Sequence, residues 1–578
     1  MKDISDLSGQ LFETYATAAS KKVSGSIHLE QLLDGMLTLP PHAAQRVGPD
    51  FSWSADPLDD ANWRFQYHTL LWLDNLREYS SEIDSELGIA LYERVLKDWI
   101  EKNSVDTPES DYAWFDMAVG VRAIVLIQAL TVFGPADWLV NSLVVHGEHL
   151  ADAANYEGKG NHSLHQDMGL IVVAQFLERN DWLELATQRI LSMFKQAIDD
   201  QGVSREGSID YQYRNYRWYE EAARRLKAAG VALPVAIESV LDRMPTFMAH
   251  ATSPSTHYAL IGDTLLHRAP IVSGTPTEWV KNKSNAPEER VALYEAGYLF
   301  ARSSWDTWHE TPATSYLTLR FGPGRSTAVH GHEDAGSITF DAHGERLLCD
   351  SGLYAYEAGA ERLFFRGRSS HNVVDVPGRA YYPSAESPMI AHRISEDHVM
   401  ATVQVRGLKG IVWHRTLLHS LKRGYILVDD RISGAEDSPT LQRWQLPPGA
   451  VTEANPAAGT CSVRTDRGNT MLFTALGNNP RVNLAYGQTE PMSGWRSDDY
   501  RNMYETPEIT FELRGPSVRF STLIQTTSST DLNWIVCSAV ERTSKLLRLS
   551  MAGHGWAEDV SLSSEGYTVT PTSSIQTA

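Results

Sequence analysis

The sequence has little cysteine and no paired cysteine motif. Among 578 residues there are three cysteines, Cys349, Cys461 and Cys537, and no two of them form a C-x-x-C pair. A disulfide framework or a thiolate zinc site needs cysteines in pairs or close clusters. Neither is therefore expected.

Long hydrophobic runs and a net positive charge are also missing. The longest apolar stretches, near residues 123–130 and 170–177, are too short to cross a bilayer, so no membrane partner is expected. The formal net charge is −21, which argues against nucleic acid, because phosphate binding favours a basic surface. The net charge does not exclude an anionic substrate that binds in a locally basic groove.

The sequence also lacks a recognisable leader. Met1–Asp6 is acidic, and no apolar segment of signal-peptide type follows it. We therefore expect a cytoplasmic protein, or a periplasmic or secreted one if a leader is missing from this sequence.

The composition that is present is that of an ordinary globular protein. Hydrophobic residues make up 42% and charged residues 21% of the chain, and 578 residues exceed what one compact core usually holds. Two or more domains are expected, and a homo-oligomer stays open. Sixteen tryptophans and 23 tyrosines suit either sugar stacking or core packing.

The first half has the hydrophobic period of helices. Three stripes recur at spacings of three and four residues, which predicts stacked helical hairpins in an all-α domain over residues 1–285. The stripes are Trp63/Tyr67/Leu70/Leu71, Val119/Ala123/Leu126/Ile127/Leu130 and Trp182/Leu185/Ala186/Ile190/Met193/Phe194/Ala197.

The second half changes to a period of two. Apolar residues alternate with others in three segments, which predicts many short antiparallel strands packed as a sandwich over residues 286–578. The segments are 316–321, 399–405 and 518–524. The domain boundary is expected in the Pro/Ser/Thr/Asn-rich stretch 253–287, and the fold class is multidomain α+β.

One cluster carries most of the chemistry. In the segment 325–334, a strand would place His330, His332 and Asp334 on one face. His332, with Asp350 and His371 further along, would offer two nitrogens and one oxygen to a divalent ion, leaving a fourth position for water. The alternative is that His371 caps a loop and Asp350 occupies a turn before Gly352.

Two further groups lie in the helical half. Asn161-His162 suits a helix N-cap with a solvated neighbour, but it also offers polar groups to a ligand. The segment 200–214 interleaves tyrosines with arginines. This pattern suits either a packed helix face or an anion-binding wall with a phenol placed for proton transfer.

In combination, these motifs resemble the heparinase II/III-like polysaccharide lyases, a superfamily that includes heparin/heparan, chondroitin and oligoalginate lyases. The resemblance covers roughly residues 60–430 and rests on motifs that follow one another in register. They are Trp63–His68, Asn161-His162, the Asp-Gly…Glu-x-Ser-x-x-Tyr run ending at Tyr211, Ile261-Gly262-Asp263, His330–Asp334, Leu348–Gly352 and Ser370–Asn372.

The resemblance implies a fold and a reaction. The fold is an N-terminal (α/α) toroid followed by a C-terminal antiparallel β-sandwich. The reaction is β-elimination at a uronate of an anionic poly- or oligosaccharide, of glycosaminoglycan or alginate type, which leaves a 4,5-unsaturated uronate at the new non-reducing end. Neutralising the carboxylate stabilises the enolate-like intermediate while one group takes the C5 proton and another protonates the leaving oxygen.

It also implies roles for residues. Asn161, with His162 nearby, corresponds to the position that contacts the uronate carboxylate. Tyr211 corresponds to the position that donates or abstracts the proton, and His330 to its acid/base partner. Tyr211 is preferred over Tyr213 and Tyr216 because it alone fits Glu206-x-Ser208-x-x-Tyr.

The same resemblance implies a zinc ion with a mainly structural role. Its ligands would be His332, Asp350 and His371, and it would hold the strands that display His330. The chain departs from many relatives at 442–448, where it reads Gln442-Arg443-Trp444-Gln445-Leu446-Pro447-Pro448 and lacks their histidine.

Several arginines are candidates for the substrate groove. A tyrosine has a pKa of about 10, so Tyr211 would act as a base only if cations lowered that value. Arg205, Arg214 and Arg217 are the candidates for this effect. Arg362, Arg366 and Arg368 would line the groove or, alternatively, form surface salt bridges.

Two other functions remain open. A uronide hydrolase would need two carboxylates flanking the bond, for which Asp210 and Glu206 are candidates. A non-catalytic glycan-binding protein would keep the fold but would hold Tyr211 and His330 far apart. The sequence does not distinguish among uronate polymers, or between endolytic and exolytic cleavage.

Overall fold

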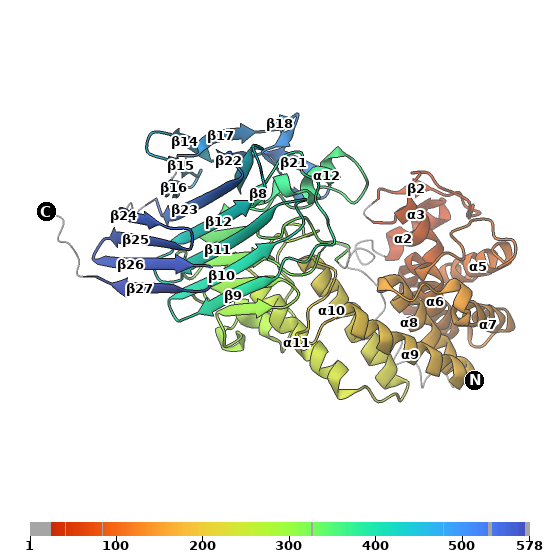
Figure 1. Ribbon diagram of the computed structural model, residues 1–578. Coiled ribbons are helices and arrows are strands. Elements are labelled where there is room, and N and C mark those ends of the chain that lie inside the picture. Colours follow the sequence, from red (N-terminus) through yellow and green to blue (C-terminus); the bar gives the residue numbers. More distant parts are fainter. Residues whose placement is uncertain are drawn as a thin grey trace. The chain divides into compact units, whose positions relative to one another are not determined.

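The computed structural model describes residues 25–40, 42–83, 85–324, 328–477, 479–529 and 534–572. The chain divides into two compact units (Figure 1). The helical unit is Met1–Ala197 with Arg217–Glu238, and the strand-rich unit is Ile198–Tyr216 with Ser239–Ala578. The division falls within the helices α10 (Ile209–Ala228) and α11 (Val235–Ala251).

The helical unit confirms the helical period of the first half. Two of the three stripes lie on helices and the third begins on one, although Leu70 and Leu71 follow the end of α3. The helices wholly within the unit are α2 (Gly25–Leu33), α3 (Ala61–Thr69), α4 (Asp74–Glu82), α5 (Glu86–Lys102), α6 (Met117–Phe133), α7 (Asp137–Ala151), α8 (Gly160–Leu177) and α9 (Asn180–Ala197).

Helices α6 and α8 form the centre of this unit. Most side chains of both helices are buried, so each helix is buried nearly all round rather than along one stripe. Two glycines let the backbones approach closely: a Cβ on Gly169 would lie 2.5 Å from the carbonyl oxygen of Gly120, and one on Gly120 would lie 2.2 Å from that of His165. Larger residues at these positions would push the helices apart.

The strand-rich unit confirms the change of period in the second half. Its named strand pairs are antiparallel. A five-stranded sheet has the order β3 (Val291–Tyr294), β4 (Tyr298–Arg302), β5 (Tyr316–Arg320), β6 (Ile338–Ala342), β7 (Glu345–Leu348).

Two further sheets follow it in the chain. The eight-stranded sheet has the order β14 (Val451–Asn455), β15 (Thr460–Arg464), β16 (Thr470–Ala475), β23 (Ser517–Thr527), β12 (Ile426–Ser433), β11 (Val412–Ser420), β10 (His398–Val405), β9 (Met389–Ile394). A four-stranded sheet has the order β17 (Arg481–Tyr486), β22 (Pro507–Leu513), β13 (Thr440–Gln445), β8 (Val374–Asp375).

The last strands form a second four-stranded sheet. Its order is β24 (Val536–Arg542), β25 (Leu546–Gly553), β26 (Trp556–Ser563), β27 (Tyr567–Pro571). Three two-stranded sheets complete the described strands: β1 (Met36–Leu37) with β2 (Gln45–Arg46), β18 (Gln488–Thr489) with β19 (Met492–Ser493), and β20 (Trp495–Asp499) with β21 (Asn502–Glu505).

The eight-stranded sheet is covered on both faces. One face shares a core with the five-stranded sheet and with β13 and β22, through residues such as Val399, Phe340 and Trp444. On the other face, Met400 and Leu427 pack in a second core with side chains of β25 and β26. For this reason β10 is buried on both of its faces, although its sequence alternates.

The strand prediction is wrong for the segment that contains the histidines. Residues 328–337 form a loop before β6, and residues 325–327 lie outside the described residues. The backbone of His330 bonds to other loops: its N–H donates to the carbonyl of Glu206 at 2.9 Å, and its carbonyl accepts from the N–H of Asp263 at 2.9 Å. These groups are therefore not available for strand pairing.

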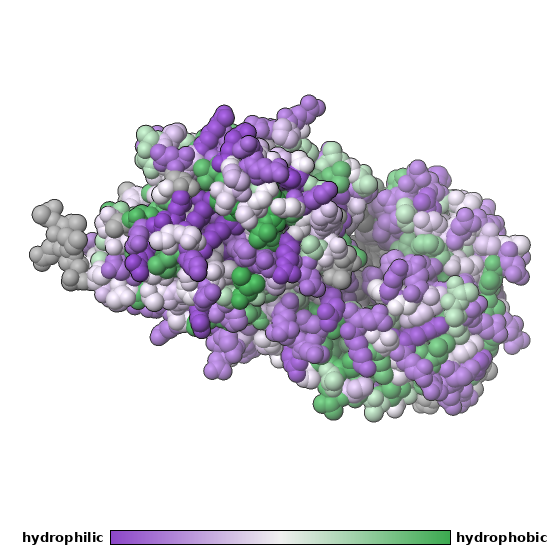
Figure 2. Space-filling view, in the orientation of Figure 1, coloured by the Kyte–Doolittle hydropathy of each residue, from purple (hydrophilic) through white to green (hydrophobic). Residues whose placement is uncertain are grey.

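No helix of the described residues is long and apolar enough to span a membrane. The visible face in Figure 2 is mainly hydrophilic, with hydrophobic side chains in small separate patches. Single exposed hydrophobic residues of this kind are normal for a folded protein surface.

Candidate active site and metal site

Three loops of the strand-rich unit meet at the histidine segment. They contain Glu206–Asp210, Ile261–Thr264 and Ala328–His332. Besides the two bonds of His330, the hydroxyl of Ser208 donates to the carbonyl of Asp263 at 2.7 Å. The three loops therefore support one another through backbone groups that lie far apart in the sequence.

Gly262 is required for this close approach. Its φ is +62°, and a Cβ there would lie 2.2 Å from the carbonyl oxygen of Gly207 and 2.7 Å from that of His330. A side chain would be strained by the backbone conformation and would also collide with both loops. This explains the glycine in the Ile261-Gly262-Asp263 motif.

The structure brings Tyr211 and His330 together. Tyr211 lies in the first turn of α10, and its ring stacks on the imidazole of His330 with centroids 3.5 Å apart and planes 13° from parallel. The guanidinium carbon of Arg214 lies 5.4 Å from the Tyr211 ring centroid. A non-catalytic glycan-binding protein is expected to hold Tyr211 and His330 far apart, and the structure does not do so.

Asp263 positions the imidazole of His330. Its Oδ2 lies 3.0 Å from Nδ1 of His330, and the other ring nitrogen, Nε2, lies 3.7 Å from a carboxylate oxygen of Glu206. Asp263 also receives two hydrogen bonds from Arg362, at 2.5 and 2.8 Å. Burial alone would raise the pKa of the Asp263 carboxyl, but the bonds from His330, His332 and Arg362 outweigh it and hold the pKa well below its usual range.

The pKa of Tyr211 shifts in the direction opposite to that expected. Burial raises it, and a hydrogen bond from Tyr356 and the charge of Arg214 offset only part of that rise. Burial also raises the pKa of the neighbouring Glu206. A protonated phenol is therefore the form of Tyr211 that this environment favours.

His332, Asp350 and His371 form the buried cluster that the sequence predicted. One ligand atom from each lies within 4.8 Å of the others. Nδ1 of His332 and Nε2 of His371 are buried and have no hydrogen-bond partner among the described residues. An unpartnered buried nitrogen is costly, and a cation between the two would satisfy both.

A neighbouring carboxylate orients one histidine of the cluster, and the carboxylate within the cluster orients the other. Nε2 of His332 lies 2.9 Å from Oδ1 of Asp263, and Nδ1 of His371 lies 2.8 Å from Oδ2 of Asp350. The remaining ring nitrogen of each histidine is thus directed to the cluster. Asp334, for which the sequence indicated no firm role, pairs with Arg320 at 3.3 Å.

The segment that departs from the relatives helps to hold this cluster. The amide of Asn372, next to His371, donates to the carbonyls of Ile338 and Cys349, and its oxygen accepts from the N–H of Gln445 at 2.6 Å. Gln445 therefore contributes through its backbone, a contact that does not require histidine at this position.

Asn161 and His162 lie in the helical unit, at the start of α8. The N-cap residue is Lys159, so Asn161 is not a cap, and no described residue bonds its side-chain amide. His162 is half exposed and pairs with Asp116, which raises the pKa of the histidine. The substrate roles of both residues remain predictions.

The arginines occupy different environments. Arg366 donates to the carbonyls of Val329 and Gly331, and Arg368 to those of Glu333 and Val374, so both support the histidine loop or its surroundings. Arg362 is buried against Asp263. Arg217 is exposed in the helical unit.

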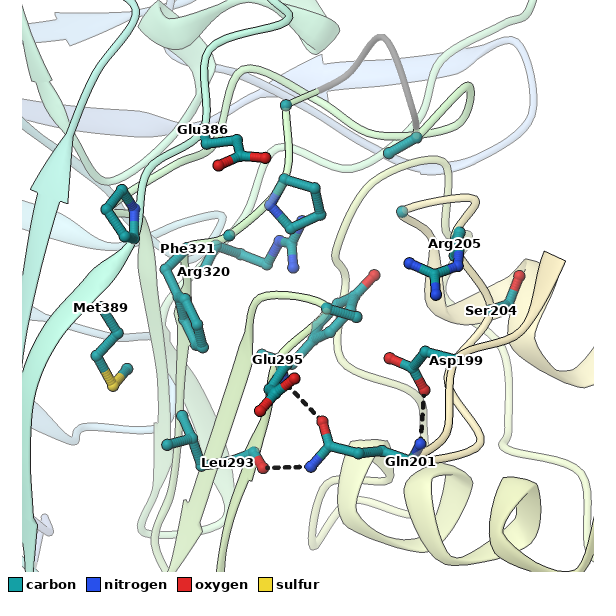
Figure 3. Close-up of a pocket in the computed structure, with 18 of the residues that line it drawn as sticks. Asp199, Gln201, Ser204, Arg205, Leu293, Glu295, Arg320, Phe321, Glu386 and Met389 are labelled. Carbon is teal, nitrogen blue, oxygen red and sulfur yellow. Dashed lines mark hydrogen bonds between the residues drawn. The ribbon is translucent and has the colours of Figure 1, made fainter. Parts of the chain in front are cut away.

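Arg205 lines a cavity of about 700 Å³ in the strand-rich unit. In Figure 3 its guanidinium points toward the cavity, with Glu386 and Arg320 on the opposite wall. Gln201 closes one end through hydrogen bonds to the backbone of Leu293 and Glu295. Arg205 is exposed and remains a candidate for anion binding.

Two residues of this site, Asp263 and Tyr356, had no role predicted from the sequence. Asp263 belonged to a recognised motif without an assigned function, and only its bond to His330 reveals one. The ring of Tyr356 meets the His330 ring edge to face, with centroids 6.1 Å apart, and the side chain is 44% exposed. No local signal distinguishes Tyr356 from the other 22 tyrosines.

Asp210, one of the two carboxylates considered for a hydrolase, is buried and already paired. Its Oδ1 lies 2.5 Å from Nε2 of His267. Glu206 accepts a hydrogen bond from the amide of Asn215 at 3.0 Å. These contacts give both carboxylates partners within the fold.

The family comparison covers most of the chain. The model described as Heparinase II/III N-terminus matches residues 14–288, and the one described as Heparinase II/III-like, C-terminal matches residues 285–535. The chain belongs to the heparinase II/III-like family. No curated protein matches it.

Solved structures of several lyases are similar to this chain. Heparan sulfate lyase HepC from Pedobacter heparinus has a TM-score of 0.74 and 15% identity, covering 98% of this chain and 91% of that one. Heparinase III has a TM-score of 0.76 and 16% identity, covering 96% and 92%. Chondroitin AC lyase of Streptomyces coelicolor A3 has a TM-score of 0.56 and 10% identity, covering 98% and 88%. The TM-scores and coverage show a shared fold, and at these identities they show the fold alone.

Proposed function

We propose that this protein is a polysaccharide lyase that cleaves a uronate-containing glycan by β-elimination. The observation that carries the proposal is the stacked Tyr211–His330 pair, with Asp263 bonded to His330. Membership of the heparinase II/III-like family supports it, and the similar structures named for heparan and chondroitin substrates favour a glycosaminoglycan. In this proposal the helical unit is an (α/α) toroid and the strand-rich unit contains a β-sandwich.

His330 is assigned as the base. A carboxylate at Nδ1 favours the tautomer that carries its proton on Nδ1, which leaves the lone pair of Nε2 free to accept another. Nε2 takes the proton from C5 of the uronate, the electron pair forms the C4–C5 double bond, and the C4–O4 bond breaks. Glu206 near Nε2 stabilises the imidazolium that results.

Tyr211 is assigned as the acid. Its raised pKa keeps the phenol protonated near neutral pH, so its hydroxyl can give a proton to the departing O4. Tyr356, which donates a hydrogen bond to the Tyr211 oxygen, stabilises the phenolate formed in this step. The proton gained by His330 then returns to Tyr211 through solvent.

Uronate recognition is assigned from the resemblance. Asn161 and His162 would neutralise the substrate carboxylate, with Arg205 and Arg214 as the cationic contributors. A hydrogen-bond donor or cation at the carboxylate stabilises the negative charge that develops when C5 loses its proton. On this assignment, Asn161→Ala would remove a contact with the substrate carboxylate.

We assign zinc to His332, Asp350 and His371. The two unpartnered imidazole nitrogens and the carboxylate are a donor set that zinc accepts. When bound, the ion would link three loops and thereby hold the segment that carries His330. Its contribution is structural, because His330 and Tyr211 supply the proton transfers.

The test is formation of an unsaturated product. Purified protein is incubated with heparan sulfate, chondroitin sulfate, hyaluronan and alginate, and the ultraviolet absorbance of the 4,5-unsaturated uronate is followed. Tyr211→Phe and His330→Ala should each lower the rate by about 10²- to 10⁴-fold, since general acid–base groups contribute that much.

Tyr213→Phe is the matched control. It removes a phenol two residues away in α10 and should leave the rate close to that of the unchanged protein. Full activity in both Tyr211→Phe and His330→Ala would refute the assignment. Cleavage without a new double bond would instead indicate a hydrolase.

A further inference from the structure

A second cavity of the strand-rich unit has a strongly cationic lining. Its volume is about 770 Å³. None of its lining residues belongs to the Tyr211–His330 pair, to the residues that contact the pair, or to the metal cluster. Among them are Arg268, Arg346, Arg467, Arg496, His257 and Trp308.

Three of these arginines form no direct salt bridge with a described residue, although the negative charge of the buried Asp341 acts on Arg346. Arg268, Arg346 and Arg467 form no ion pair with a carboxylate in the described part of the chain, whereas Arg496 pairs with Asp498 at 2.7 Å. Two of these guanidinium groups donate to neutral oxygens: Arg346 to the hydroxyl of Ser255 at 3.4 Å and Arg467 to the carbonyl of Gly344 at 2.8 Å.

The charges of two of these arginines affect a neighbouring histidine. Burial is the main cause that lowers the pKa of His257, and the positive charges of Arg346 and Arg268 lower it further. The two arginines therefore act on the same point of the cavity wall. In a chain with a net charge of −21, four arginines in one cavity lining are a local concentration of positive charge.

The acidic residues of the lining do not cancel this charge. They are Glu345 and Asp466, against four arginines. Glu345 forms no salt bridge with a described arginine; its Oε2 accepts from the hydroxyl of Thr465 at 2.6 Å and from the amide of Asn469 at 2.9 Å. An anion entering the cavity would therefore meet an excess of donors.

The lining also offers an apolar surface. The indole of Trp308 is fixed by a hydrogen bond from Nε1 to the carbonyl of Thr314 at 3.1 Å, and Pro447 and Pro448 lie in the same lining. A fixed aromatic face is a suitable surface for a sugar ring, and guanidinium groups match sulfate and carboxylate geometry. The volume lies within the range of about 300–1,000 Å³ typical of small-molecule sites.

We propose that this cavity is a binding site for an anionic sugar. Arg268, Arg346 and Arg467 bind its sulfate or carboxylate groups, and the ring packs on Trp308. The site goes beyond β-elimination and does not depend on it, because binding here involves no residue of the Tyr211–His330 pair. Sulfate and carboxylate share this chemistry, and the probes below distinguish them.

The test measures binding to the full chain by titration calorimetry. The probes are a sulfated uronate disaccharide, the same disaccharide without sulfate, neutral cellobiose and inorganic sulfate. Disaccharides are used because they leave little for a lyase to cleave, so binding is measured whether or not the catalytic assignment is correct. At least one of the two uronate disaccharides, sulfated or unsulfated, should bind. Its affinity should fall as the salt concentration rises.

The variants are Arg268→Gln and Arg467→Gln, both at exposed positions where the fold tolerates the change. Each should weaken disaccharide binding roughly fivefold, because it removes one charge-assisted contact. Arg481→Gln is the matched control: Arg481 is exposed on β17, has no ion pair with a described carboxylate and does not line this cavity.

Several results would overturn the proposal. Equal affinities in Arg268→Gln, Arg467→Gln and Arg481→Gln would place the binding elsewhere. Cellobiose binding as tightly as the charged disaccharides would remove the role of the anion. Inorganic sulfate binding as tightly as the disaccharides would remove the role of the sugar ring.

Discussion

At the residue scale, Asp263 connects the two candidate sites. Its carboxylate accepts from His330, His332 and Arg362. A carboxylate at Nδ1 of His330 and at Nε2 of His332 fixes which nitrogen of each ring carries the proton. The same side chain therefore leaves Nε2 of His330 free for proton transfer and Nδ1 of His332 free for a metal.

Asp263→Asn should lower activity and stability together. An amide cannot accept all these hydrogen bonds, so Arg362 would be left buried without a charged partner, which costs about 3–5 kcal/mol of unfolding free energy. His330 would lose its fixed orientation, and we expect the rate of unsaturated-product formation to fall by at least tenfold to a hundredfold. The measurements are the turnover rate and the denaturant midpoint.

Asp430→Asn is the matched control for this prediction. Asp430 pairs with Arg415 in the core at 2.7 Å, and both side chains are fully buried. Its replacement should reduce stability similarly but leave activity intact at temperatures where the variant is folded. If both variants lost activity equally, the effect of Asp263 would be structural only.

At the scale of elements, the metal cluster joins three segments. His332 lies in the loop before β6, Asp350 just after β7, and His371 just after the short helix η6 (Arg368–Ser370). The cluster is the point where side chains of these three segments converge. A bound ion would therefore stabilise loops more than strands.

Removal of the metal should lower thermal stability. A ligand present at about 1,000 times its dissociation constant stabilises the folded state by about 4 kcal/mol, so a chelator should lower the Tm by several degrees. His371→Ala should reproduce the loss without chelator. Elemental analysis of the purified protein should find about one zinc per chain, and calorimetry should report the Tm.

His398→Ala is a suitable comparison, because His398 is a largely buried histidine outside the cluster. It should keep the metal content of the unchanged protein. Purified protein that contains no zinc and does not respond to added zinc or chelator would contradict the assignment.

At the scale of the whole molecule, the C-terminal sheet protects one face of the eight-stranded sheet. Strands β24 to β27 begin at Val536, just beyond the region matched by the family model, which ends at residue 535. Met400, Leu418, Leu427 and Leu523 of the larger sheet are fully buried in the core that this C-terminal sheet completes.

Deletion of residues 534–578 should expose that face. Each of these side chains contributes about 1.5–3 kcal/mol when buried, so their loss is comparable to the total stability of many proteins. We expect aggregation and increased binding of a hydrophobic dye, measured by sedimentation and fluorescence. Deletion of residues 573–578 alone is the control, and equal behaviour of the two truncations would contradict the prediction.

Much of the secondary structure could be predicted because it depends on neighbours in the sequence. The spacing of Trp182, Ala186 and Ile190 places them on one face of α9, and the alternation near Val399 indicates β10. The metal cluster could be predicted as well, because His332, Asp350 and His371 belong to motifs that fall in register with a known family.

The loop that contains His330 could not be predicted, because its conformation depends on distant partners. His330 is bonded through its backbone to Glu206 and Asp263, which lie 124 and 67 residues away in the numbering. Residue spacing carries no information about such contacts. The local pattern therefore favoured a strand where the tertiary structure forms a loop.

The sequence by itself determined the two periods of the chain, its family resemblance and the residue types available for chemistry. Only the tertiary structure decided that Asp263 holds both His330 and His332, that burial raises the pKa of Tyr211, and that Arg268, Arg346 and Arg467 line one cavity. The physical reason is that hydrogen bonding, desolvation and charge depend on distances in space, which the fold sets.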